Sequence, residues 1–207
     1  MPRSILAFWG LCLLAVAGMY AWRLSRPDEQ GSARSGASDG SKIESLNHPV
    51  GRFTLTERSG EPFDSASLDG DVWIASFFFT SCPGVCLRLN SAIAQLQSEL
   101  DDSIRFVSIT VDATTDTPEK LRKYADHYQA DAERWLFLTG EAEEIRRIAN
   151  EGFLVSGARE THSDRLIVVD RQGRIRGAYR GTEETQIRLL KRKVAALLSE
   201  PADRPPS

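Results

Sequence analysis

The sequence predicts an α/β domain in which a central mixed sheet is flanked by helices. One observation is a nearly continuous apolar run over residues 72–80, which has the length of a strand and is typical of one covered on both faces. Another is the alternation, after this run, of further strand-like segments with segments of helical periodicity. The chain has 207 residues and is 41% hydrophobic, so we expect one domain of ordinary size with a normal core.

The first predicted elements are a hairpin, a central strand and a helix. The segments RFTLTE and EPF flank the turn dipeptide Ser59-Gly60, which is a hairpin signal. After the strand at 72–80 the chain turns helical, and Pro83 is expected in the first helical turn, where its missing N–H costs little. This helix is indicated by apolar residues at spacings of three or four, namely Val85, Leu89, Ile93, Leu96 and Leu100.

The remaining elements continue the alternation of strands and helices. In chain order they are a strand at 104–112, a helix from a capping signal at 116–119 to about Tyr128, a strand at 135–140, a helix at 141–150, a hairpin of RLIVVD with RIRGAYRG across residues 171–173, and an amphipathic helix at 183–199.

This order of elements, with two cysteines opening the first helix, is that of a thioredoxin-like fold. The extra hairpin and an extra helix between the strands indicate the peroxiredoxin-like elaboration of that fold. We expect the folded domain over residues 48–200 and a disordered tail over 201–207. Residues 24–47 are rich in Gly, Ser, Arg and Asp, so we expect a flexible linker there.

The N-terminal segment is apolar. Residues 4–22 carry no charge and as a helix would span roughly 28 Å, close to the hydrocarbon thickness of a bilayer. We expect residues 1–23 to be an uncleaved transmembrane helix that anchors the chain in a membrane, and a signal peptide cleaved after AVA is the alternative. Either puts the domain on the exported side, periplasmic or equivalent, where thiols can be oxidised. The pI of about 5.7 predicts no nucleic-acid partner.

Cys82 and Cys86 are the only cysteines outside the N-terminal apolar segment. They lie between a buried strand and a helix, where free N–H groups and the helix dipole stabilise a thiolate. Two thiols so placed can close a disulfide or hold a soft metal ion such as Cu(I). The three intervening residues leave more room for an ion than the two of most thioredoxin-like redox enzymes, so the CxxxC spacing slightly favours metal.

A trigonal copper site needs a third ligand, and the domain offers three histidines. His48 stands at the entrance to the domain, and His127 lies in a predicted helix. His162 precedes the strand RLIVVD, in the loop that faces the cysteine helix in a thioredoxin-like fold, and is therefore the predicted ligand. Asp112 and Asp116 could steer a cation, but we expect Asp112 to end a strand and Asp116 to cap a helix.

Three segments resemble the Sco/SenC family of copper-binding, thioredoxin-like proteins: FFFTSCPGVC, VDATTDTPEKLRKYA and THSDRLIVVDRQGRI. The likeness covers roughly residues 51–198. It implies copper, as Cu(I) or Cu(II), held by Cys82, Cys86 and His162. It also implies a metallochaperone that supports assembly of the copper A centre of cytochrome c oxidase. The implied partners are the oxidase subunit that carries this centre, other copper chaperones and thiol–disulfide reductants.

The chain departs from the family's usual pattern near these ligands. Many members have an acidic residue where this chain has Gly84, a proline where it has Leu87, and an aspartate where it has Thr161. Fewer carboxylates lessen the negative field around the metal, which bears on affinity and partner choice.

The cysteine pair also bears on two other functions. The alternative to copper delivery is a membrane-anchored thiol–disulfide oxidoreductase or redox sensor, which needs only Cys82 and Cys86, and some members of the family act in this way. A peroxiredoxin-type peroxidase is disfavoured, because neither cysteine is preceded by the proline and hydroxyl residue that such a loop requires.

Overall fold

The computed structural model describes Met19 and residues 47–155 and 164–201. By its contacts the chain divides into Met1–Asp39 and Gly40–Ser207, and the fold below is that of the second unit. Among the described residues, no helix is long and apolar enough to cross a membrane. The predicted anchor (apart from Met19) and the predicted linker (apart from Asn47) lie outside the described residues, as do the loop with His162 and all but the first residue of the tail.

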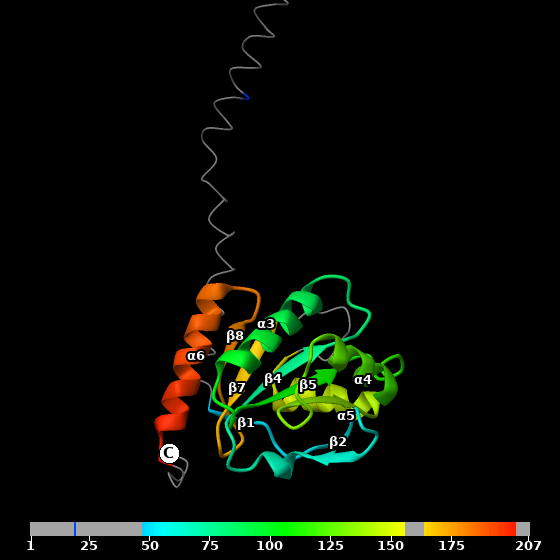
Figure 1. Ribbon diagram of the computed structural model, residues 1–207, viewed down its shortest axis with the longest axis horizontal. Coiled ribbons are helices and arrows are strands. Elements are labelled where there is room, and N and C mark those ends of the chain that lie inside the picture. Colours follow the sequence, from blue (N-terminus) through cyan, green and yellow to red (C-terminus); the bar gives the residue numbers. More distant parts are fainter. Residues whose placement is uncertain (1–18, 20–46, 156–163, 202–207) are drawn as a thin grey trace, which may run out of the picture. The chain divides into compact units, whose positions relative to one another are not determined.

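An eight-stranded mixed sheet forms the centre of the domain (Figure 1), in the order β1-β8-β7-β4-β5-β6-β2-β3. Strands β4, β5 and β6 are parallel, and all other pairs are antiparallel. The strands are β1 His48–Pro49, β2 Thr54–Glu57, β3 Pro62–Asp64, β4 Trp73–Phe78, β5 Arg105–Thr110, β6 Trp135–Thr139, β7 Arg165–Val169 and β8 Arg174–Arg180. The predicted mixed sheet and both predicted hairpins, β2–β3 and β7–β8, are confirmed.

Helices cover both faces of this sheet. Helices α3 (Val85–Glu99), α4 (Pro118–His127) and α6 (Glu184–Ser199) pack on one core, and α5 (Ala142–Arg147) with the short helices η2 (Ser65–Leu68) and η3 (Ile148–Gly152) packs on the other. All six residues of β4 are buried between the two cores. This burial explains the nearly continuous apolar sequence of β4. Successive side chains of a strand point to opposite faces of the sheet, and here both faces are covered.

Two predicted details at helix starts are wrong. Helix α3 begins at Val85, so Pro83 lies in the bend before the helix, and the N-cap is Gly84, which has no side chain to accept an N–H. Helix α4 is capped by Thr117, whose hydroxyl accepts the N–H of Lys120. Asp116 therefore does not cap the helix, and its carboxylate instead accepts hydrogen bonds from Thr80 and Thr110.

The helix predicted over 141–150 is shorter and changes form. Helix α5 ends at Arg147, and the chain continues as one π-helical turn, η3. This turn fits closely against the residue that follows β1, because a Cβ on Gly152 would lie 2.6 Å from the carbonyl oxygen of Val50. The beginning of the domain is thus in contact with the segment that leads to residue 156.

Candidate metal and redox site

The structure brings Cys82 and Cys86 together at the end of β4. Cys86 is the second residue of α3, and the backbone N–H of Cys82 donates to the carbonyl of Phe79 at 3.2 Å. Both cysteines are free thiols and only 3% exposed, and their side chains are hydrogen-bonded to each other. The predicted convergence of the two sulfurs is therefore present in the fold.

The two thiols differ in acidity. Burial acts to raise the pKa of Cys82, but the Cys86 thiol and the backbone N–H groups of Gly84, Cys86 and Val85 outweigh it, and the pKa of Cys82 lies below its ordinary value. These N–H groups belong to the start of α3, where no carbonyl of the helix itself accepts them. The helix start thus stabilises a thiolate at Cys82, as expected from its position.

Cys86 behaves in the opposite way. Burial, and then its hydrogen bond to Cys82 and the charge of that neighbour, raise the pKa of Cys86 to about 12. Cys82 is therefore the first thiol of the pair to ionise, and Cys86 keeps its proton and donates it toward the Cys82 sulfur. Once Cys82 has ionised, the pair offers one soft anionic donor and one neutral thiol, and Cys86 must also lose its proton before two thiolates can hold a metal ion.

A buried carboxylate holds the chain just before Cys82. Asp116 has no exposed surface and accepts the backbone N–H of Thr80 at 2.9 Å, the Thr80 hydroxyl at 2.5 Å and the Thr110 hydroxyl at 2.6 Å. Lys120 lies 3.5 Å from the same carboxylate. Asp116 thus joins the end of β5 to the segment that carries Cys82.

A second polar group lies next to Cys86 inside the core. The amide nitrogen of Asn90 donates to the backbone carbonyl of Cys86 at 2.9 Å and to the Tyr124 hydroxyl at 3.2 Å, and Asn90 is fully buried. Its amide oxygen has no hydrogen-bond partner among the described residues. Sequence reasoning missed Asn90, although a polar residue on the apolar stripe of a helix, four positions after Cys86, was a usable signal.

The other predicted site residues lie apart from this pair or outside the described chain. The His48 ring pairs with the backbone carbonyl of Glu151 at 2.8 Å, and His127 is exposed at the end of α4. His162 lies outside the described residues, within which no group of three His, Cys, Asp or Glu side chains is arranged to hold a metal. Asp112 lies two residues beyond β5, where its backbone carbonyl accepts the N–H of Asp116.

The surface beside the cysteines is mixed and open at Gly84. Leu87, next to Cys86, is 42% exposed, and Ser81 and Arg88 are exposed as well. A Cβ added to Gly84 would meet no atom within 4 Å, so there is room for a side chain at this position.

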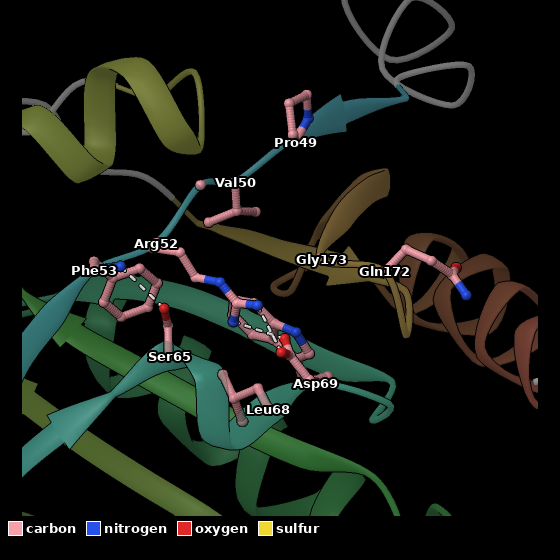
Figure 2. A pocket seen from close by; sticks show the side chains of 11 residues that line it. Pro49, Val50, Arg52, Phe53, Ser65, Leu68, Asp69, Gln172 and Gly173 are labelled. Atoms are coloured by element: carbon pink, nitrogen blue, oxygen red, sulfur yellow. Dashed lines mark hydrogen bonds and ion pairs between the residues drawn. The ribbon is translucent and has the colours of Figure 1, made fainter. Parts of the chain in front are cut away.

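A separate hollow lies on the opposite core (Figure 2). It has a volume of about 170 Å³ and is formed by Val50, Leu68 and Trp73 with neighbouring residues. Arg52 and Asp69 form a bidentate ion pair beside it, with N–O distances of 2.7 and 2.6 Å. No cysteine lines it, so it is not part of the thiol site.

Comparison with known proteins places this site in a family. The SCO1/SenC family model matches residues 42–199. A Stutzerimonas stutzeri protein named for copper binding is 30% identical over 143 residues, which are 63% of this chain and 69% of that protein.

Two solved structures share the fold. A SCO1/SenC family lipoprotein of Bacillus anthracis has a TM-score of 0.67 and 30% identity, covering 74% of this chain and 97% of that one. BsSco, described with a disulfide switch and as a member of the Sco family of cytochrome c oxidase assembly proteins, has a TM-score of 0.66 and 28% identity, covering 77% and 99%. With its thioredoxin-like sheet, its paired thiols and a family match over three quarters of its length, the chain belongs to the SCO1/SenC family.

Proposed function

We propose that this chain binds one copper ion through Cys82, Cys86 and His162 and supports assembly of the copper A centre of cytochrome c oxidase. The ion is cargo, taken up from a copper donor and passed to the oxidase subunit that carries this centre. The relative named for copper binding and the oxidase-assembly role of the Sco family support the proposal.

The observation that carries the proposal is the pair of buried, reduced thiols at the start of α3. Thiolates are soft donors that select Cu(I), and a buried apolar surround keeps water from competing for the ion. Cys82 is already biased toward the thiolate by the N–H groups of the helix start. Of the two protons that copper binding displaces, the one on Cys86 is the more firmly held.

Copper content of purified variants tests the three ligands. We expect about one copper per chain for the wild type, none for Cys82→Ser with Cys86→Ser, and loss of tight binding for His162→Ala while its disulfide still forms. His127→Ala is the matched control, because His127 is an exposed histidine on α4. If His162→Ala bound Cu(I) and Cu(II) as tightly as the wild type, the three-ligand site would be wrong.

A second candidate function is thiol–disulfide exchange, and the opposite acidities of the two thiols favour it. Ionised Cys82 attacks one sulfur of a partner disulfide, and Cys86 then displaces the partner from the mixed disulfide. The Cys82–Cys86 bond forms as the partner bond breaks. Two electrons and the proton of Cys86 pass from this chain to the partner, and a second proton comes from solvent, so that the partner leaves as a dithiol.

Exchange in the absence of copper separates the two functions. A reductase should reduce a partner disulfide without copper, and Cys82→Ser should abolish the reaction, whereas His162→Ala should leave it intact. A pair that proved inert to exchange across the potentials of an oxidising compartment would eliminate this candidate. The two functions are compatible, because copper binding needs the reduced pair.

We further propose that residues 1–23 anchor the chain in a membrane, with the domain on the exported side. The uncharged segment 4–22 and the lipoprotein nature of the Bacillus anthracis relative support a membrane-held domain. Flotation of the full chain with lipid vesicles, compared with a chain in which Leu13 and Leu14 are changed to Arg, tests the anchor. Equal flotation of the two chains would contradict it.

A further inference from the structure

Charge is divided unevenly along the domain. Residues 47–155 hold ten Lys and Arg against eighteen Asp and Glu, whereas residues 164–201 hold nine Lys and Arg against five Asp and Glu. A chain that is acidic overall, with a net charge of −3, thus has a basic segment at residues 164–201. Charge asymmetry of this kind indicates a surface that meets an anionic partner.

The fold gathers this basic segment at one end of the sheet. Residues 164–201 form β7, β8 and α6, which we call the basic end, and α6 packs on β8 and β7. Figure 1 shows α6 along one side of the domain, with α4 and α5 on the other. In the strand order, β8 and β7 stand on one side of β4, while β5, β6 and the β2–β3 hairpin stand on the other.

Ion pairs do not neutralise the basic end. Four of its acidic residues pair with its own arginines, and Glu99 of α3 pairs with Lys191. Among the described residues, Arg192 and Lys193 have no ion-pair partner. Arg188 and Arg192 are both exposed and four residues apart, so they lie on one face of α6.

The chain also enters the domain at this end. Its first strand, β1, pairs with β8, where His48 is opposite Ile175 and Pro49 is opposite Arg174. Arg174 also binds Asn47, the residue before β1. The described part of the domain therefore begins beside β8.

We propose that the basic end lies on the anionic phospholipid headgroups of the membrane that holds residues 4–22. Each Lys or Arg close to such a surface strengthens association by roughly fivefold, and the attraction acts within about one Debye length. Because the described chain begins beside β8, the basic end is the part of the domain that lies next to the point where the linker joins it. The inference rests on the proposed anchor and not on copper binding.

Lysine acylation of the full chain in lipid nanodiscs tests the contact, because the chain carries reporters at both ends. Lys191 and Lys193 lie on the basic end, and Lys120 and Lys123 lie on α4. In nanodiscs containing phosphatidylglycerol, a water-soluble acylating reagent should modify Lys193 at least about fivefold more slowly than in phosphatidylcholine nanodiscs. Lys123 should react equally in both, and high salt should abolish the difference.

A charge-reversal variant sharpens the test. In phosphatidylglycerol nanodiscs, the double variant Arg188→Glu with Arg192→Glu should react at Lys193 as fast as the wild type does in phosphatidylcholine. The variant keeps both reporter lysines, Lys193 and Lys123. Arg146→Glu with Arg147→Glu on α5 is the matched control, since these arginines are also exposed and paired within their helix, and it should change nothing. The wild-type comparison of lipids and salt stands without either variant, so misfolding of a variant does not remove the test.

Three results would overturn the proposal. They are equal labelling of Lys193 in both lipids, protection that persists at high salt, and failure of the chain to enter nanodiscs. Protection by an acidic protein but not by anionic lipid would make the basic end a protein-docking surface, which also contradicts it. Copper content is measured on the same samples, so a chain that binds no copper but shows lipid-dependent protection would sink the proposed function alone.

Discussion

The carboxylate of Asp116 shows how a single residue can govern the position of a thiol it does not touch. It accepts three hydrogen bonds, two of them from Thr80, which lies two residues before Cys82. A fully buried carboxylate is costly unless such donors satisfy it. The network therefore both stabilises the fold and restrains the segment that carries the more acidic cysteine.

Asp116→Asn should loosen that segment. The asparagine amide has one oxygen acceptor and one nitrogen donor, so it leaves at least one of the buried Thr80 and Thr110 donors without an acceptor. We therefore expect the free energy of unfolding in urea to fall by about 2–3 kcal/mol. We also expect faster reaction of Cys82 with a maleimide under native conditions. Asp126→Asn, at an exposed position of α4, is the control and should change neither quantity. Equal losses in the two variants would show that the buried network is not the cause.

Titration of the thiols should show two well separated steps. Thiolate absorbance of the reduced protein should first rise below the pH at which an ordinary cysteine ionises, from Cys82, and the second step should come near pH 12, from Cys86. In Cys86→Ala the first step should move to higher pH, because Cys82 loses a hydrogen-bond donor. Two steps close together near pH 9 would contradict the assigned acidities.

At the scale of elements, α3 starts without a side-chain cap. Gly84 holds the N-cap position, where aspartate is among the preferred residues, and there is free space for a side chain. Because glycine is itself tolerated at the N-cap, Gly84→Asp should raise the free energy of unfolding by only about 0.3 kcal/mol. It should also raise the pKa of Cys82, because a carboxylate disfavours a nearby thiolate.

Gly84→Ala separates the two effects of that substitution. It removes backbone freedom without adding charge or a cap, so the pKa of Cys82 should stay where it is in the wild type. Urea unfolding and thiolate absorbance are the two measurements. An unchanged Cys82 pKa in Gly84→Asp would mean that the side chain points away from the thiol.

Elements with a strong pattern were predictable, and residues that depend on distant partners were not. The strand β4 was recognisable because burial on both faces leaves a continuous apolar run, and the cysteine pair because it follows that strand. The role of Asp116 was not recognisable, because Thr80 and Thr110 reach it only after β4 and β5 pair. Locally, Asp116 and Thr117 are both good N-caps, and the choice between them depends on these tertiary contacts.

At the scale of the whole molecule, the cysteine pair links stability to pH. Cys86 has a pKa raised from 9.0 to about 12, so its contribution to stability is complete below pH 9 and is lost as pH rises from 9 to 12. Cys82 has a lowered pKa, so its contribution is present above pH 9 and is lost as pH falls through its folded value. Together the two contributions are largest near pH 9.

Unfolding of the reduced wild type should be compared with that of Cys82→Ala with Cys86→Ala from pH 6 to 12. Because the rest of the chain is the same in both proteins, the difference in unfolding free energy reports the cysteine pair together with its coupling to Tyr124, whose pKa the neighbouring Cys86 helps to raise. We expect this difference to rise toward pH 9 and to fall above it. A difference that kept rising above pH 9 would contradict the buried, protonated state of Cys86.

The strand β1 has a mechanical consequence for a domain held by its N-terminal segment. It contains two residues, and they pair only with the edge of β8. A pull on the preceding chain reaches these few hydrogen bonds first, well before the parallel strands β4, β5 and β6 that support the thiols. Under tension we therefore expect the edge strand β1 to detach first and to lengthen the tether, while the strands that support the thiol pair stay in place.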